Sequence, residues 1–150
     1  MAKSLKIIVV GGVAAGPKAA ARARRCDPQA EITILEKGQF ISYAGCGLPY
    51  LIEGKVPDMK DLLATPVGVM RNPDFFRAVK AVNVLTGKEA MEIDRANRVV
   101  KVRDLATSQA ETYPYDRLVL ATGAVPVRPR LFLCKAFRQR EHARARSLCY

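Results

Sequence analysis

The chain has 150 residues, of which 49% are hydrophobic and 26% are charged, enough for one globular domain and too apolar for wholesale disorder. Its formal net charge is +11, yet residues 1–127 hold 18 Lys and Arg against 13 Asp and Glu, whereas residues 128–150 hold seven basic residues against one acid. The body also lacks any signature of a nucleic-acid-binding fold, so we do not expect nucleic acid to be the main partner.

Nothing in the sequence predicts a membrane anchor, a secretory leader or a metal site. The apolar run at residues 7–10 is too short for a bilayer, and no long apolar core follows Lys3 and Lys6. The chain has four cysteines, which are Cys26, Cys46, Cys134 and Cys149. They form no CxxC pair, and the single histidine, His142, has no metal-ligand neighbours, so we expect neither zinc nor a disulfide framework. These features predict a cytoplasmic protein.

The first elements predict a βαβ unit. Residues 5–10 are a short, β-branched apolar run that ends in glycines, as a buried parallel strand does. The Ala- and Arg-rich residues 14–25 predict a helix that ends at Asp27-Pro28. Residues 31–36 predict a second strand, which completes the unit.

The turn between the first strand and the helix has the form of a dinucleotide-binding fingerprint, Gly11-Gly12-Val13-Ala14-Ala15-Gly16. Gly11 permits a tight turn, Gly16 lets the helix pack closely, and the first helical N–H groups would face a pyrophosphate. Val13 stands where the pattern usually has its middle glycine. Glu36, which ends the second strand, is the acid that binds a ribose hydroxyl in such units. The alternative is a tight βα turn without a ligand.

A loop follows, and then a short helix around residues 46–53 with Gly54 as its stop. Cys46 lies among small residues at the start of that helix, where its sulfur is accessible and a thiolate is favoured. No second cysteine is near it, which excludes an internal dithiol. From these residues alone a buried structural cysteine remains an alternative for Cys46, and we expect Cys26 to be of that kind.

The rest of the chain predicts helical patches, then strands, then a tail. Residues 58–79 look helical, broken by Pro66 and Pro73. Strands are predicted at 82–86, 89–94, 99–103 and 117–121, with a polar loop at 107–111. The last strand ends in Ala121-Thr122-Gly123, where backbone could approach a cofactor, or which could be an ordinary strand-ending turn.

These elements together resemble the pyridine nucleotide-disulfide oxidoreductases, specifically their coenzyme A-disulfide reductase and persulfide-reductase branch. The resemblance covers residues 5–129 and is most specific at 9–16, 21–25 and 42–50. It implies an α/β fold: an incomplete Rossmann-like FAD-binding domain over residues 1–129, with a parallel sheet and an antiparallel β-meander.

The resemblance also implies the site residues. FAD would lie on the fingerprint, with Glu36 and Lys37 at the adenosine ribose and Ala90 at the adenine. Ala121, Thr122 and Gly123 would lie beside the dinucleotide. Cys46 would form a mixed disulfide with coenzyme A or a persulfide. The family positions that contact coenzyme A are here Lys18, Arg22, Arg25 and Ser42. Gly45 replaces an Asn common in the family, which removes a side-chain donor and leaves the thiol substrate open.

The leading hypothesis is therefore NAD(P)H-driven, FAD-dependent reduction of a coenzyme A disulfide, a persulfide or a similar small disulfide by a member of a homodimeric family. The alternatives are an NADH oxidase or peroxidase that cycles Cys46 through a sulfenic acid, and a non-catalytic FAD- or nucleotide-binding fragment. Residues 130–150 are a basic tail unlike the family, which we expect to be unstructured and which is typical of a frameshift or truncation. We therefore expect the chain alone to be an inactive fragment.

Overall fold

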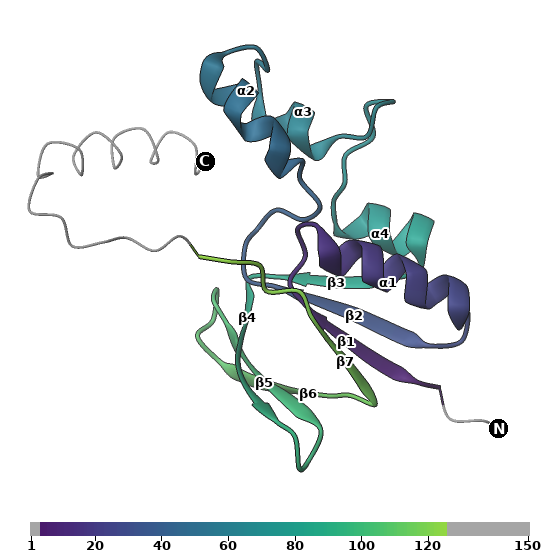
Figure 1. Ribbon diagram of the computed structural model, residues 1–150. Helices are drawn as coiled ribbons and strands as arrows, with labels where there is room; N and C mark the ends of the chain where they lie inside the picture. Colours follow the sequence, from purple (N-terminus) through teal and green to yellow (C-terminus); the bar gives the residue numbers. More distant parts are fainter. Residues whose placement is uncertain (1–3, 126–150) are drawn as a thin grey trace, which may run out of the picture.

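The computed structural model describes residues 4–125, which form two sheets and several helices, of which the helices at 15–26 and 73–80 cover one sheet (Figure 1). A parallel sheet has the order β3-β2-β1-β7, made of β1 (Lys6–Val10), β2 (Glu31–Glu36), β3 (Asn83–Thr86) and β7 (Arg117–Leu120). An antiparallel sheet has the order β4-β5-β6, made of β4 (Lys88–Asp94), β5 (Val99–Asp104) and β6 (Ala110–Pro114). The helices are α1 (Ala15–Cys26), α2 (Leu48–Glu53), α3 (Met59–Leu63) and α4 (Pro73–Lys80), with a 3₁₀ turn η1 (Gly45–Gly47) before α2. This arrangement confirms the predicted α/β fold class.

Both faces of the central strands β1 and β2 are covered, which explains their runs of apolar residues. On one face Val9 and Ile34 pack with Ala20 of α1 and Phe76 of α4. On the other face Ile8 and Leu35 pack against valines of β5, namely Val100 and Val102. These parts therefore form three layers: helices α1 and α4, the parallel sheet and the antiparallel sheet, while α2 and α3 stand away from the sheets (Figure 1).

Several predicted elements are confirmed with nearly the same bounds. The first strand, the helix after it and the second strand are β1, α1 and β2, and the last strand is β7. The short helix near Cys46 is α2, and it ends at Gly54, which has the left-handed φ of 84° expected of a helix stop. Within residues 4–125 no helix is long and apolar enough to cross a membrane. The predicted boundary at 129 and the predicted tail lie outside the described residues.

Three expectations were wrong. The polar loop predicted at 107–111 overlaps β6, which pairs with β5 from Ala110 onward. Pro73 begins α4 instead of breaking a helix, because proline lacks only an N–H that has no partner in the first turn, and the Asn72 side chain caps the helix by accepting from Phe75 N–H (2.8 Å). Cys26 is exposed, because α1 turns Gly16, Pro17 and Ala20 toward the sheet instead.

Candidate functional site

A cavity of about 500 Å³ opens where β1, β2 and β7 end, beside the start of α1 and of β4. Every predicted cofactor-binding residue except Gly16 lies on its wall: Gly11, Gly12, Val13, Ala14, Ala15, Glu36, Lys37, Ala90, Ala121, Thr122 and Gly123. These residues come from four separate stretches of the chain. The fold thus brings the predicted set together at the carboxyl edge of a parallel sheet, where α/β folds bind their ligands.

Two glycines allow the backbone at this edge to pack without side chains. Gly11 has a left-handed φ of 106°, and a Cβ there would overlap the carbonyl oxygen of Ala121 at the end of β7. A Cβ on Gly16 would overlap the carbonyl oxygen of Gly11, so the helix start rests directly on the turn. Gly16 does not line the cavity itself, but it packs against Gly11, which does.

The N-terminus of α1 is suited to an anion. Its N-cap is Ala14, which makes no side-chain capping bond, and the first turn carries no acidic residue. The first N–H groups of this 12-residue helix thus have no intrahelical acceptor, and the helix dipole adds partial positive charge at the cavity. A phosphate or pyrophosphate would supply the missing acceptors.

Glu36 places a buried carboxylate at the same cavity. Its Oε2 accepts from the N–H of Gly12 (2.5 Å), and its Oε1 accepts from the N–H of Gly38 (2.7 Å). A carboxylate offers about four lone-pair positions, so two remain for other donors. The carboxylate can therefore hold the glycine turn and accept bonds from ribose hydroxyls at the same time.

Two further charged residues on the cavity wall, Lys88 and Glu89, were missed by the sequence analysis. Glu89 accepts from Lys37 Nζ (2.7 Å) and from the Arg103 guanidinium (2.5 Å). Lys37, and after it Arg103, holds the pKa of the Glu89 carboxyl below its usual value. The signal that could have found both residues is their position directly before Ala90, on the strand already expected to approach the cofactor.

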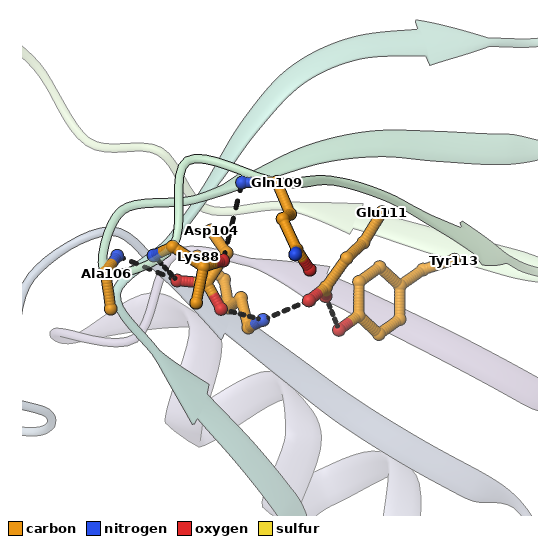
Figure 2. Close-up of polar contacts among 7 residues, drawn as sticks. Lys88, Asp104, Ala106, Gln109, Glu111 and Tyr113 are labelled. Carbon is orange, nitrogen blue, oxygen red and sulfur yellow. Dashed lines mark hydrogen bonds and ion pairs between the residues drawn. The ribbon is translucent and has the colours of Figure 1, made fainter.

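Lys88 lies at the centre of a polar cluster that joins all three strands of the antiparallel sheet (Figure 2). Its Nζ donates to Asp104 (2.7 Å) and to Glu111 (2.5 Å), and the Lys88 side chain is only 14% exposed. These bonds raise the pKa of Lys88 and lower the pKa of both carboxyls. Tyr113 donates to Glu111 (2.6 Å), and burial, together with this bond, raises the pKa of Tyr113 to about 12. The cluster fixes the start of β4, where Lys88 reaches the cavity.

Cys46 lies in η1 and is exposed, so the alternative of a buried structural cysteine is wrong for it. It does not line the cavity. The segment before it bonds directly to the cavity turn, because Ser42 N–H donates to the carbonyl of Gly12 (2.8 Å). Cys26 is exposed as well, so exposure alone does not distinguish the two thiols, and the nucleophilic role of Cys46 stays a prediction.

The residues predicted to contact coenzyme A lie on two neighbouring parts of the molecule. Three basic side chains on α1 are exposed: Lys18, Arg22 and Arg25. Their helical spacing puts them on one side of α1, the helix whose first residues line the cavity. Ser42 and Gly45 lie in the segment that carries Cys46, the first half-buried and the second exposed. No hydrogen bond or ion pair found within residues 4–125 joins the three basic side chains to that segment, so their shared role stays a prediction.

Comparisons with known proteins show the family to which the chain belongs. The family model described as pyridine nucleotide-disulphide oxidoreductase matches residues 5–148. Coenzyme A disulfide reductase of Staphylococcus haemolyticus is 41% identical over 119 residues, which are 79% of this chain and 26% of that protein. NADH oxidase of Methanocaldococcus jannaschii is 31% identical over 125 residues, 83% of this chain and 26% of that protein. The structure of an NAD-dependent persulfide reductase from A. fulgidus has a TM-score of 0.81 and 41% identity, over 85% of this chain and 23% of that one.

The chain spans about a quarter of the length of these relatives. The family match extends past residue 129, where the sequence analysis set a boundary, and that boundary stays a prediction. Matched over nearly its whole length, the chain belongs to the pyridine nucleotide-disulphide oxidoreductase family.

Proposed function

We propose that this chain is the FAD-binding part of an oxidoreductase that uses NAD(P)H to reduce a coenzyme A disulfide, a persulfide or a similar small disulfide. The observation that carries the proposal is the cavity, whose wall combines an uncapped helix N-terminus, a buried carboxylate and closely packed backbone. The similarity to a coenzyme A disulfide reductase and to a persulfide reductase supports the substrate class.

The residues present fit FAD. The N-terminus of α1 would hold the pyrophosphate, and the free lone pairs of Glu36 would accept from a ribose. Ala90 and the stretch 121–123 add short side chains to the cavity wall, where flat rings can lie against backbone. When bound, FAD supplies the two-electron relay between a nicotinamide and sulfur.

A charge at Ala15 tests this assignment. Ala15 is the exposed first residue of α1 and lies on the cavity wall. In Ala15→Asp, the new carboxylate interacts favourably with the helix dipole, by about 0.3–1 kcal/mol, so the free energy of unfolding should hold or rise. The same carboxylate repels a pyrophosphate, so we expect FAD affinity to fall about tenfold or more in a fluorescence titration.

Ala15→Asn is the matched control, since the asparagine side chain has nearly the same size as aspartate but carries no charge. The FAD dissociation constant of Ala15→Asn should lie within a few-fold of that of the unchanged chain. An Ala15→Asp variant that binds FAD as well as Ala15→Asn would contradict the placement of the pyrophosphate at α1.

For the sulfur chemistry we propose Cys46 as the nucleophile. Its thiolate would attack one sulfur of a coenzyme A disulfide, so the disulfide bond breaks, a mixed disulfide forms on Cys46, and one coenzyme A leaves as a thiolate that takes up a proton. Two further electrons, from NAD(P)H, are needed to release the second coenzyme A. The exposed position of Cys46 leaves its sulfur open to such a substrate.

An NADH oxidase or peroxidase is the second candidate, favoured by the relative from Methanocaldococcus jannaschii. Mass spectrometry of the reduced chain separates the two. After incubation with coenzyme A disulfide we expect an adduct on Cys46 that is absent from Cys46→Ser, with much slower modification of Cys26. A Cys46 that forms a sulfenic acid with peroxide, but no coenzyme A adduct, would favour the oxidase.

A further inference from the structure

Arg71, just before α4, connects two segments that flank Cys46 in the chain. Its Nη1 donates to the carbonyl of Ser42 (2.9 Å), and its Nε donates to the carbonyl of Ala64 (3.2 Å), which also accepts from Nη2. The backbone N–H of Arg71 donates to the carbonyl of Leu63 (2.8 Å). One half-buried side chain thus reaches both the segment before Cys46 and the segment after α3.

These contacts close a loop at its base. The loop runs over residues 42–64 and contains η1, α2 and α3, and therefore Cys46. Inside the base, the N–H of Ala44 donates to the carbonyl of Leu62 (2.9 Å). We call residues 42–64 the redox loop, and Arg71 is the side chain that spans its two ends.

The end at Ser42 is held in an uncommon conformation. Ser42 has a left-handed φ of 53°, a conformation that residues other than glycine rarely adopt. Its N–H bonds to Gly12, whose own N–H bonds to Glu36 on the cavity wall. Ser42 is therefore the junction between the cavity and the redox loop, and Arg71 binds the carbonyl of this junction.

The arrangement requires a guanidinium. Among residues 4–125 no ion pair of Arg71 with an acidic side chain is found, and the acceptors of its guanidinium are the two carbonyls. A lysine would keep the charge, but its donors sit on a single atom and cannot reach both carbonyls in the same fork. The fork of donors on the Arg71 guanidinium, more than its charge, connects the two ends of the redox loop.

We propose that Arg71 is a positioning residue for the reaction at Cys46: by clamping both ends of the redox loop it sets where Cys46 stands relative to the cavity and to the bound disulfide. The inference rests on the proposed function, because it takes Cys46 as the reacting thiol.

The test compares two thiols in one molecule. In the 150-residue chain carrying Cys134→Ser and Cys149→Ser, only Cys46 and Cys26 remain, and both are exposed. The rates of both thiols are measured by mass spectrometry with coenzyme A disulfide and with 2-hydroxyethyl disulfide, for the chain itself, Arg71→Lys and Arg71→Met. In the chain itself, Cys46 should prefer coenzyme A disulfide over the small disulfide. In both variants this preference should fall about tenfold or more, because reacting groups lose their alignment.

Cys26 is the internal control, and its two rates should not change. A preference at Cys46 that both variants keep would overturn the inference. So would full rescue by Arg71→Lys, since it would assign the effect to charge instead of to the clamp.

A second measurement separates this inference from the proposed function. If Cys46 shows no preference even with Arg71 present, the proposed substrate is wrong, and amide hydrogen exchange then decides the clamp. The N–H groups of Ser42 and Ala44 should exchange faster in both Arg71 variants, while the amides of β1 keep their rates. Unchanged exchange at Ser42 and Ala44 would overturn the role of Arg71.

Discussion

The cavity and the redox loop are built from different kinds of contact. At the cavity the contacts join backbone to backbone. The backbone of Gly16 packs against the carbonyl of Gly11, and the backbone of Gly11 packs against the carbonyl of Ala121. The redox loop is instead held by side chains, because Arg71 bonds to both of its ends and the Leu62 side chain packs beside Gly47. The first region tolerates no added atom, whereas the second can adjust by moving a side chain.

This difference determines what each region can vary. A site shaped by backbone needs glycine at fixed places, since no side-chain rotation relieves an overlap with a carbonyl oxygen. A loop held by side chains can change its neighbouring residues and keep its base, as at Gly45, whose Cβ position is nearly open. Gly45 is also the position where the resemblance implies an Asn. The cavity therefore admits fewer substitutions than the redox loop.

The largest effect is expected at Gly16. Helix propensity alone predicts that Gly16→Ala stabilises α1 by about 1 kcal/mol. We expect instead a loss of about 2 kcal/mol or more in the free energy of unfolding, measured in urea, because the new Cβ overlaps the carbonyl of Gly11 and the turn must move. FAD retention should be lost as well, since the same turn forms the cavity wall.

Gly47→Ala is the matched control in the redox loop. Gly47 has an ordinary φ of −84°, and its Cβ would meet the end of the Leu62 side chain, which can rotate away. We expect a change below about 1 kcal/mol and normal FAD retention. Equal losses at the two glycines would show that the two regions do not differ as described.

The part of the fold that the sequence predicts best is the part set by local rules. The strand, glycine turn, helix and acidic strand end of residues 6–36 are each specified by neighbouring residues, and all lie where predicted. Strand β6 was missed because its residues are polar and partly exposed, and their partners lie on β5. Cys26 was misplaced because burial on an Ala-rich helix depends on which side meets the sheet.

The site divides in the same way. The residues of the cavity wall that belong to the fingerprint, to Glu36 and to the stretch 121–123 were predicted from motifs at strand ends. The contacts of Lys88 and Arg71 were not predicted, because their partners are distant in sequence: Glu111 is 23 residues from Lys88, and Ser42 is 29 residues from Arg71. A single sequence carries no signal that pairs such residues before the fold brings them together.

A smaller effect is expected at Lys88, whose cluster of charged side chains supports the cavity wall at the start of β4. In the present chain Lys88 lowers the pKa of Asp104 and of Glu111, so both carboxylates stabilise the fold above their ordinary pKa near 4, and this contribution is lost as the pH falls through their folded values. In Lys88→Met the two carboxylates face the same space without a cation, so the variant should lose stability as the pH rises and they ionise. The Tm of the variant should lie several degrees lower at pH 7 to 8, and the difference should narrow toward pH 4.

Lys101→Met is the control for this last effect, because Lys101 pairs with Glu92 (3.1 Å) on the same sheet while both side chains are about half exposed. A surface pair of this kind contributes little, so its Tm should hardly change at any pH. The cluster of Lys88 differs because the Lys88 side chain is 14% exposed and its ammonium binds two carboxylates at once. Thermal unfolding of both variants across pH 4 to 8 therefore tells whether β4 is held at the cavity by charge. If the Tm of Lys88→Met were lower by the same amount at every pH, the cluster would act through packing, and the start of β4 would be held at the cavity without a contribution from its charges.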